Sequence, residues 1–483
     1  MMRDKGDMPV VNSPMKAAAL ITPLVLLVLL VMSLIFFKER MLYIDAPHML
    51  FRIINDGRFH IEEHRYGSFI SQLFPWIGIR LHIPLMGLMI LYSAGFYIFY
   101  LSVALLLVYK FRNYGLAILL GLYFTLFVSD TYYWPNNEVH QGIAWLTFTF
   151  GVNYFAAERR WPFPVRLVLF FGSFFLSIWT HPLVMLAAVY LWFFYVADRK
   201  LFSSTRVQMV LFSVILIVLA GVKFYQGMQH GYDSSKIEVL TGFDIHRLRS
   251  IFSSPQFRFF KDGISGRYLL FSVLFITGLI SLLANKRYLL FAWTILFATG
   301  YVALICVTYW DFTLRSFMES EYMPLVIICC APFVYYVIPM MRPKLCVAAI
   351  AVVYFIRIAF IVVAAGPFSN RVAMMERINE KMKQKQLTKV IITSPFPPII
   401  DSVLISKWGA PVESMFLSKL RGETPQRTFI FLDSQEMMSF HTAARDTLLG
   451  AWEKRAAVNI NPAYCSIDTS VQYSVLTYRM LME

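Results

Sequence analysis

Long uninterrupted apolar runs recur along this chain of 483 residues and constrain its fold more than any other feature. Most of these runs can cross the hydrocarbon core of a bilayer, which takes roughly 20 helical residues. A spanning segment has no water to bind its backbone polar groups, so it must satisfy them internally as a helix. The composition agrees, with 58% hydrophobic and 15% charged residues. We therefore expect an all-α polytopic membrane bundle.

The apolar runs predict about eleven transmembrane helices. The run from Leu167 to Val196 is divided at Thr180-His181-Pro182, because proline interrupts a helix. The expected spans are residues 17–37, 85–109, 115–130, 142–157, 167–180, 182–196, 207–224, 269–284, 288–308, 323–340 and 345–365.

Lys and Arg are distributed unevenly over the loops between these spans. With the N-terminus in the cytoplasm, the cytoplasmic loops hold fifteen of them and the short loops on the other side hold only Arg315. Cytoplasmic loops of membrane proteins carry an excess of Lys and Arg. No small-residue cleavage site follows the first run, which indicates an uncleaved span. We expect a multi-pass protein of the inner or plasma membrane with a cytoplasmic N-terminus.

The net charge of +15 does not indicate nucleic-acid binding, because many basic residues lie in short loops where they set the topology. A basic surface that faces anionic headgroups or a lipid phosphate is a second interpretation. Four of the five cysteines lie in apolar runs, and only Cys465 lies in a soluble stretch. Neither a disulfide framework nor a cysteine metal motif is expected.

The composition changes at about residue 365, where apolar runs give way to a charged and mixed sequence. Residues 1–365 form the expected transmembrane domain, with long extracytoplasmic loops at 38–84 and 225–268. In residues 366–483, helical patterns at 371–386 and 434–445 alternate with strand-like runs at 389–393 and 428–432. This alternation predicts a small C-terminal α/β domain on the extracytoplasmic side, the periplasm in a bacterium.

The first long loop contains several residues that could carry chemistry. Asp45 lies just past the first span, where a lone carboxylate is costly unless it has a function. Residues 49–56 have apolar side chains at helical spacing and are expected to form a surface helix. Residues 59–67, which include His64 and Arg65, could bind a metal ion or an anion. A solvated charged loop is the alternative for this segment.

Glu138 and His140 lie at the mouth of the fourth span, where both could face Asp45. Two carboxylates with a histidine are suited to general-base catalysis or to a divalent cation. Interfacial aromatic residues with an asparagine helix cap are the alternative. His181 lies at a tight turn on the same side, as a turn residue or as a ligand.

Arg315 is the only cation of the short extracytoplasmic loops, and guanidinium binds phosphate well. An ion pair with Asp311 or Glu319 is the alternative. In residues 225–268, basic and aromatic residues interleave, as they do in a segment that touches lipid phosphate. Ordinary interfacial packing produces the same pattern.

Together these features resemble the GT-C superfamily of membrane glycosyltransferases. Its members have many spans, a long first extracytoplasmic loop that opens with an acidic residue, and a second acidic motif in the next such loop. Asp45 matches the first acidic position, and Glu138 within Asn136-Asn137-Glu138-Val139-His140 matches the second. Ala46 follows Asp45 where many members have another acidic residue. The Trp-Trp-Asp-Tyr-Gly signature of oligosaccharyltransferases is absent, so asparagine glycosylation is not expected.

The resemblance implies transfer of a sugar from a polyprenyl-phosphate or polyprenyl-diphosphate donor, often with Mg²⁺ or Mn²⁺. Asp45 would be the general base or a metal ligand, and Glu138 and His140 would complete that site. Arg315 would hold the phosphate of the leaving carrier. Further candidates for substrate binding are His181, Arg65 and His64.

The expected partners are the bilayer, a polyprenyl-phosphate-linked sugar, and a glycan, lipid or protein acceptor. The alternatives are a transporter of lipid-linked glycans and a non-enzymatic membrane assembly scaffold. Transporters place ionisable groups near the membrane midplane, often in repeated halves, whereas here these groups cluster at the outer mouth.

Overall fold

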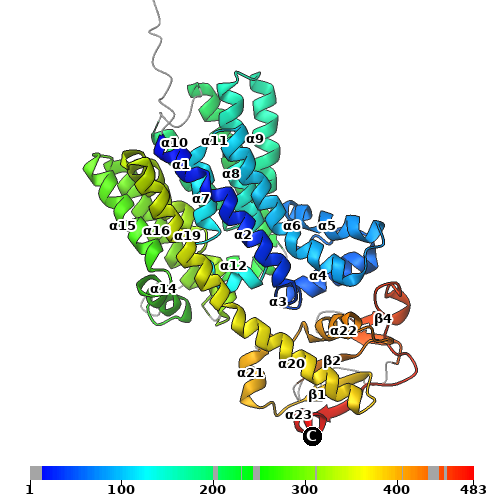
Figure 1. The fold of residues 1–483 in the computed structure, drawn as a ribbon. Helices are drawn as coiled ribbons and strands as arrows, with labels where there is room; N and C mark the ends of the chain where they lie inside the picture. The colour runs from blue at the N-terminus through cyan, green and yellow to red at the C-terminus, as the bar shows by residue number, and fades with distance from the viewer. Residues whose placement is uncertain are drawn as a thin grey trace, which may run out of the picture.

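The computed structural model describes residues 13–198, 205–229, 231–242, 251–310, 313–404, 406–432, 445–450 and 454–483. These residues form a large helical bundle and a small region with strands near the C-terminus (Figure 1). The helices of the bundle are α1 (Ser13–Ala19), α2 (Ile21–Ile35), α3 (Phe37–Met41), α4 (Asp45–Asp56), α5 (Phe69–Arg80), α6 (Leu85–Leu105), α7 (Tyr114–Tyr123), α8 (Glu138–Glu158), α9 (Phe163–Ile178), α10 (Val184–Ala197), α11 (Arg206–Gln229), α12 (Tyr232–Thr241), α14 (Pro255–Ser265), α15 (Leu269–Ala284), α16 (Tyr288–Thr308), α17 (Arg315–Tyr322), α18 (Leu325–Pro332) and α19 (Pro343–Val363).

Five helical segments are long and apolar enough to cross a membrane: Ser13–Ile35, Leu85–Lys110, Arg206–Gln229, Tyr288–Thr308 and Pro343–Gln384. The number becomes seven if each of two bent pairs, α14 with α15 and α17 with Leu325–Met340, is one span. Many apolar side chains on these helices are exposed, among them Val210, Ile217 and Ile280, as expected of surfaces that face lipid.

Each of the eleven expected spans overlaps a helix, but the span expected at 115–130 is helical only to Tyr123, and length and composition support five to seven crossings. Helices α7, α9 and α10 are apolar and have only 10–17 residues, fewer than the roughly 20 that a straight crossing takes. Helix α7 ends at Tyr123, before residue 130, where the predicted span ends.

The last long helix leaves the bundle and continues as α20 (Ala365–Gln384) to the C-terminal region (Figure 1). The composition changes at residue 366, but the helix does not end there. Pro367 lies in the first turn of α20, where proline is tolerated.

The C-terminal region contains a three-stranded parallel sheet in the order β2-β1-β5. In the register of this sheet, Val390 of β1 lies opposite Phe429 of β2 and Ser474 of β5. A separate antiparallel pair joins β3 and β4. The elements are β1 (Lys389–Thr393), α21 (Pro398–Val403), α22 (Ala410–Leu420), β2 (Thr428–Leu432), β3 (Thr447–Leu449), β4 (Lys454–Ala456), β5 (Ser474–Thr477) and α23 (Tyr478–Met482).

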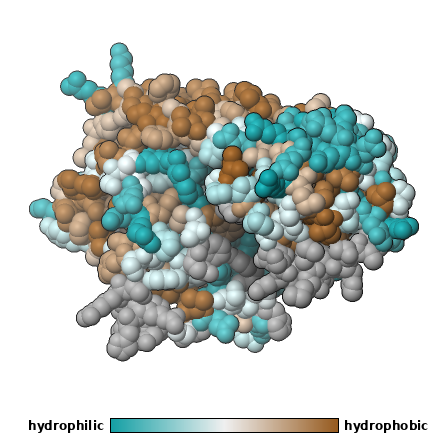
Figure 2. Space-filling model, turned by 90° about the horizontal axis from the view of Figure 1, so that it is seen from below, coloured by the Kyte–Doolittle hydropathy of each residue, from teal (hydrophilic) through white to brown (hydrophobic). Residues whose placement is uncertain are grey.

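The strands at 389–393 and 428–432 form as predicted. Residues 433–444, which hold most of the helix expected at 434–445, lie outside the described residues. Seen from the side of the C-terminal region, hydrophilic side chains gather on the right of the molecule and hydrophobic ones occupy the upper and left margin (Figure 2).

The C-terminal region packs against α4 at one end of the bundle. Arg455 forms an ion pair with Asp56, and the Asn461 backbone N–H donates to the Asn55 side chain, 2.6 Å away. These contacts anchor the last turn of the helix that begins with Asp45.

Candidate functional site

Helix α4 is amphipathic, and burial of its apolar face sets the position of Asp45, the first residue of the helix. Its side chains Met49, Leu50, Ile53 and Ile54 are buried, and Gly57 ends the helix with a left-handed φ of 63°. The helix begins at Asp45, four residues earlier than residues 49–56 of the prediction. A carboxylate in the first turn is favoured by the helix dipole.

Asp45 is half-buried and lies in an acidic environment. Its Oδ2 accepts a hydrogen bond from Nε1 of Trp134, 2.7 Å away. The pKa of Asp45 is raised to about 7, and burial is the largest cause. The hydrogen bond from Trp134 and the charge of Arg65 lower this pKa, whereas the charges of Glu138 and Glu62 raise it. A carboxyl group of this pKa exchanges a proton near neutral pH.

Glu138, in the first turn of α8, is paired with Arg65. Nη1 of Arg65 lies 2.8 Å from Oε2 of Glu138, and its Nη2 lies 3.1 Å from Oδ1 of Asp233 on α12. Burial alone would lower the pKa of Arg65, but the two carboxylates outweigh it and raise that pKa above its ordinary value. Arg65 thus joins the first loop to α8 and α12 and is already occupied by protein carboxylates.

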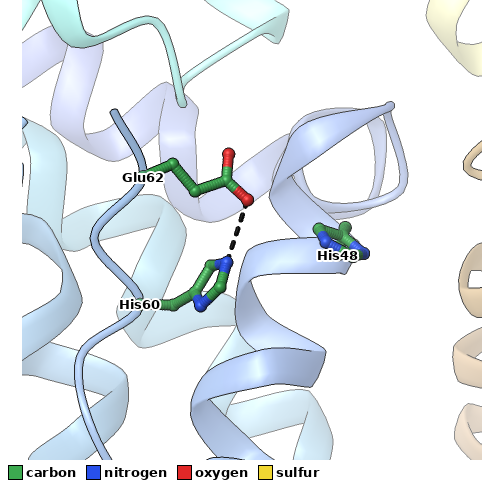
Figure 3. Close-up of side chains that lie close together, drawn as sticks. All are labelled: His48, His60 and Glu62. Atoms are coloured by element: carbon green, nitrogen blue, oxygen red, sulfur yellow. Dashed lines mark hydrogen bonds and ion pairs between the residues drawn. The ribbon is translucent and has the colours of Figure 1, made fainter. Parts of the chain in front are cut away.

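A second cluster lies where α4 faces the first loop. His48 projects from α4 toward His60 and Glu62 of the loop, and Nε2 of His60 is 2.9 Å from Oε1 of Glu62 (Figure 3). One ligand atom from each of the three side chains lies within 4.8 Å of the others. Among the described residues, this is the one group of three His, Cys, Asp or Glu side chains with such spacing.

Each of the three predicted histidines, His140, His181 and His64, makes a local contact with a residue outside these clusters. Nδ1 of the buried His140 lies 3.2 Å from the hydroxyl of Tyr123, in the interior of the bundle. Nδ1 of His181 accepts from the backbone N–H of Leu183, 3.2 Å away, within the turn before α10. His64 is exposed and contacts the Tyr66 hydroxyl.

Arg315 forms an ion pair with a carboxylate that the sequence prediction did not name. Its Nε lies 3.2 Å from Oδ2 of Asp130, and Nη1 of Arg267 lies 3.2 Å from the same oxygen. Of the two partners that the sequence suggested, Asp311 lies outside the described residues and Glu319 accepts from the Thr131 backbone and hydroxyl. Two guanidinium groups share one carboxylate, so a positive charge remains at this position.

An apolar cavity of about 800 Å³ is lined by residues of α14, α15, α16 and α18. Arg267 lies in the break between α14 and α15, and residues on both sides of it line the cavity. The lining includes Phe252, Phe257, Phe260, Ile264, Phe271 and Phe275. Of the long loop expected at 225–268, residues 243–250 with Arg247 and Arg249 are outside the described part of the chain.

Asp45 and Arg315 belong to the same end of the bundle and are joined by two contacts. The Trp134 ring, which donates to Asp45, packs on Phe317 with ring centroids 4.2 Å apart. The Tyr43 hydroxyl lies 3.1 Å from the Ser316 hydroxyl. These contacts place the segments that carry Asp45 and Arg315 next to each other.

Two fully buried arginines, Arg40 and Arg357, hold the segment between these clusters. Arg40 donates to the Tyr132 carbonyl and to the Ser93 hydroxyl. Arg357 donates to the Val128 carbonyl, 2.9 Å away, and to the Arg267 carbonyl. These bonds satisfy buried donors and fix the backbone around the 3₁₀ turn η3 (Asp130–Tyr133).

Sequence inspection alone missed His48, Asp130 and Trp134 as site residues. His48 follows Asp45 by three residues, so both lie on one face of a helix, and this spacing is a signal that could have been used. No comparable local signal links Asp130 to Arg315 or Trp134 to Asp45. Comparison with models of protein families, with curated proteins and with solved structures finds no match to this chain.

Proposed function

We propose that the chain is a GT-C-like membrane glycosyltransferase of about eleven spans. It moves a sugar from a polyprenyl-phosphate or polyprenyl-diphosphate donor to a glycan, lipid or protein acceptor on the extracytoplasmic side. One observation carries the proposal: half-buried Asp45 and the pair Arg267 and Arg315 lie on segments that the contact between Trp134 and Phe317 joins. Residues on both sides of Arg267 in the sequence line an apolar cavity.

Asp45 acts as the general base in this proposal. It takes the proton of the acceptor hydroxyl while that oxygen forms a bond to the anomeric carbon of the sugar. The bond between this carbon and the phosphate oxygen breaks, and its electron pair leaves with the carrier. A pKa of about 7 is well matched to this role, because a base is most effective when its pKa is near the working pH.

Arg267 and Arg315 stabilise the leaving carrier phosphate. Negative charge grows on the phosphate as the bond breaks, and donors already in place stabilise such charge without reorganisation. Side chains of Arg267 and Arg315 are 25% and 56% exposed, so both can reach a ligand while they contact Asp130. The apolar cavity, which residues on both sides of Arg267 in the sequence line, is suited to the first isoprene units of the carrier.

Glu138 and Arg65 orient the acceptor side of the site. Their ion pair is 2.8 Å long and lies next to a small polar cavity that Glu138 and Gln141 line. His140, His181 and His64 have no assigned step, because each is engaged in a local contact away from Asp45.

Asp45 and Glu138 are a poor fit for the Mg²⁺ or Mn²⁺ that the resemblance implies. One oxygen of Asp45 is bound by Trp134, and one oxygen of Glu138 is bound by Arg65. The two residues do not belong to a group of three ligand atoms within 4.8 Å in the described chain. No step is therefore assigned to either ion.

The test uses purified protein in detergent with a panel of polyprenyl-phosphate and polyprenyl-diphosphate sugars, with and without Mg²⁺ or Mn²⁺. Release of the free carrier, followed by mass spectrometry, detects transfer or slow hydrolysis without knowledge of the acceptor. Asp45→Asn should abolish release and leave expression intact. Asp262→Asn makes the same chemical change at an exposed position and serves as the control.

Release that persists in Asp45→Asn would remove Asp45 from the mechanism. No release from any donor, together with movement of a lipid-linked glycan across liposomes that contain the protein, would favour the transporter interpretation.

A further inference from the structure

The strongest unassigned feature of the molecule is the cluster of His48, His60 and Glu62. It combines two imidazoles and one carboxylate from two separate elements, α4 and the loop that follows it (Figure 3). This set differs in chemistry from Asp45 and Glu138, which offer only oxygen. Imidazole suits Zn²⁺, Cu²⁺ and Ni²⁺, whereas Mg²⁺ takes oxygen ligands.

We propose that His48, His60 and Glu62 bind one divalent transition-metal ion, with Zn²⁺ as the best fit. Two histidines and a glutamate are a set of three protein ligands that leaves one position of a tetrahedral Zn²⁺ open. This proposal goes beyond the transferase reaction and does not depend on it.

The spacing of the ligand atoms needs only a small adjustment. Two ligands of a tetrahedral Zn²⁺ lie about 3.4 Å apart, as bond lengths of about 2.1 Å require. His60 Nε2 and Glu62 Oε1 lie 2.9 Å apart, and all three ligand atoms lie within 4.8 Å of one another.

The backbone that carries His60 is already rigid. Buried Gln72 accepts from the His60 N–H and donates to the His60 carbonyl, each at 2.7 Å. Nε1 of Trp76 donates to the Gly57 carbonyl, 3.1 Å away, and the Phe59 ring packs on Trp76. Ligands held in this way lose little conformational entropy when an ion binds.

An adjoining polar cavity contains an unsatisfied buried group. His60, Glu62, Glu138 and Gln141 line a cavity of about 10 Å³, close to the room that a single water molecule needs. Gln141 is 2% exposed, and its Oε1 has no hydrogen-bond partner. A water molecule on the open position of the ion can donate to this oxygen, which accounts for an orphaned acceptor in the interior.

The ion would connect three parts of the chain. His48 belongs to the helix that begins with Asp45, and His60 and Glu62 belong to the first loop. The His48 ring also packs edge-on against Trp408 of the C-terminal region, with centroids 6.1 Å apart. Binding would therefore order α4 between the loop and the C-terminal region.

The experiment uses the full chain in detergent, purified with a tag that contains no histidine. The protein is exposed to Zn²⁺, desalted, and analysed for retained metal by mass spectrometry. The variants are His48→Gln, His60→Gln and Glu62→Gln. His64→Gln is the matched control, because His64 is an exposed histidine of the same loop that contacts Tyr66.

The wild type and His64→Gln should retain one equivalent of Zn²⁺. Each of the three ligand variants should bind Zn²⁺ at least about tenfold more weakly than the wild type does. Co²⁺ in the wild type should give the visible absorption of a tetrahedral site, and the band should be lost in His60→Gln. Glu62 is exposed, so Glu62→Gln tests the site without a change in packing.

Failure of the wild type to retain Zn²⁺ would overturn the proposal. Equal retention by the wild type and by well-folded His60→Gln and Glu62→Gln would overturn it as well. Neither result bears on carrier release by Asp45, so the two proposals can fail separately.

Discussion

The carboxylate of Glu413 accepts a hydrogen bond from the backbone N–H of Ile44, 3.1 Å away, and thereby links α22 to the residue before Asp45. Ile44 has a φ of 53°, which is unusual for a β-branched residue and costs on the order of 1–3 kcal/mol. A Cβ on Gly409 would clash with Glu413 Oε1 and lie 3.3 Å from the Ile44 Cα, so the contact requires a glycine. The C-terminal region thus holds the backbone conformation that begins α4.

Glu413→Gln should destabilise the protein by about 3 kcal/mol, because it leaves a buried arginine without its partner. Glu413 is fully buried, and Nη2 of Arg371 lies 2.8 Å from its carboxylate. Thermal unfolding in detergent, followed by tryptophan fluorescence, measures the change. Glu380→Gln breaks the exposed pair with Arg421 and should change stability by less than about 1 kcal/mol. Equal effects of both variants would contradict the role of Glu413.

The sequence was sufficient to predict many of the helices and two strands, because these depend on local pattern. The apolar runs of β1 and β2 and the amphipathic residues 49–56 of α4 are examples, although α4 begins earlier, at Asp45. The partners of buried polar groups depend on tertiary contacts far apart in the chain. Asp45 and Trp134 are 89 residues apart, and Ile44 and Glu413 are 369 apart. Local sequence patterns do not contain such pairs.

Carrier release should increase with pH around a midpoint near 7, because Asp45 must be deprotonated to accept a proton. The measurement is the initial rate of release across a buffer series, with saturating donor. A rate that is constant between about pH 5.5 and about pH 8.5 would contradict the assignment of Asp45 as the base.

Asp45 should also make stability depend on pH. Burial raises its pKa from the ordinary 3.8 to about 7, so the folded chain binds the proton more tightly than the unfolded chain. The contribution of Asp45 to stability is full below pH 3.8 and is lost as the pH rises through 7. The unfolding temperature of Asp45→Asn minus that of the wild type should therefore increase as the pH is raised from about 5 to about 8. A difference that is constant over this range would contradict the raised pKa.

Arg267→Gln and Arg315→Gln should each weaken binding of a polyprenyl phosphate by about ten- to a hundredfold, since a charge-assisted hydrogen bond contributes about 1.5–3 kcal/mol. Binding of the uncharged polyprenol should change little, because the apolar cavity is intact in both variants. Native mass spectrometry in detergent compares the two ligands. Arg206→Gln, at an exposed arginine that begins α11, is the control. Equal weakening of the alcohol and the phosphate would exclude a phosphate contact.

Trp134→Phe should shift the pH profile of carrier release to higher pH. The Trp134 N–H donates to Oδ2 of Asp45 at 2.7 Å and favours the charged carboxylate, so its loss raises the pKa of Asp45 above about 7. Phenylalanine retains an aromatic ring against Phe317, so the packing between the acidic and basic clusters should survive. The initial rate across pH, with Trp76→Phe as a matched indole deletion, separates this effect from a general loss of stability. Trp76 donates to the Gly57 carbonyl and does not bond to Asp45. An unchanged midpoint with a lower maximal rate would mean that Trp134 positions Asp45 without tuning its proton affinity.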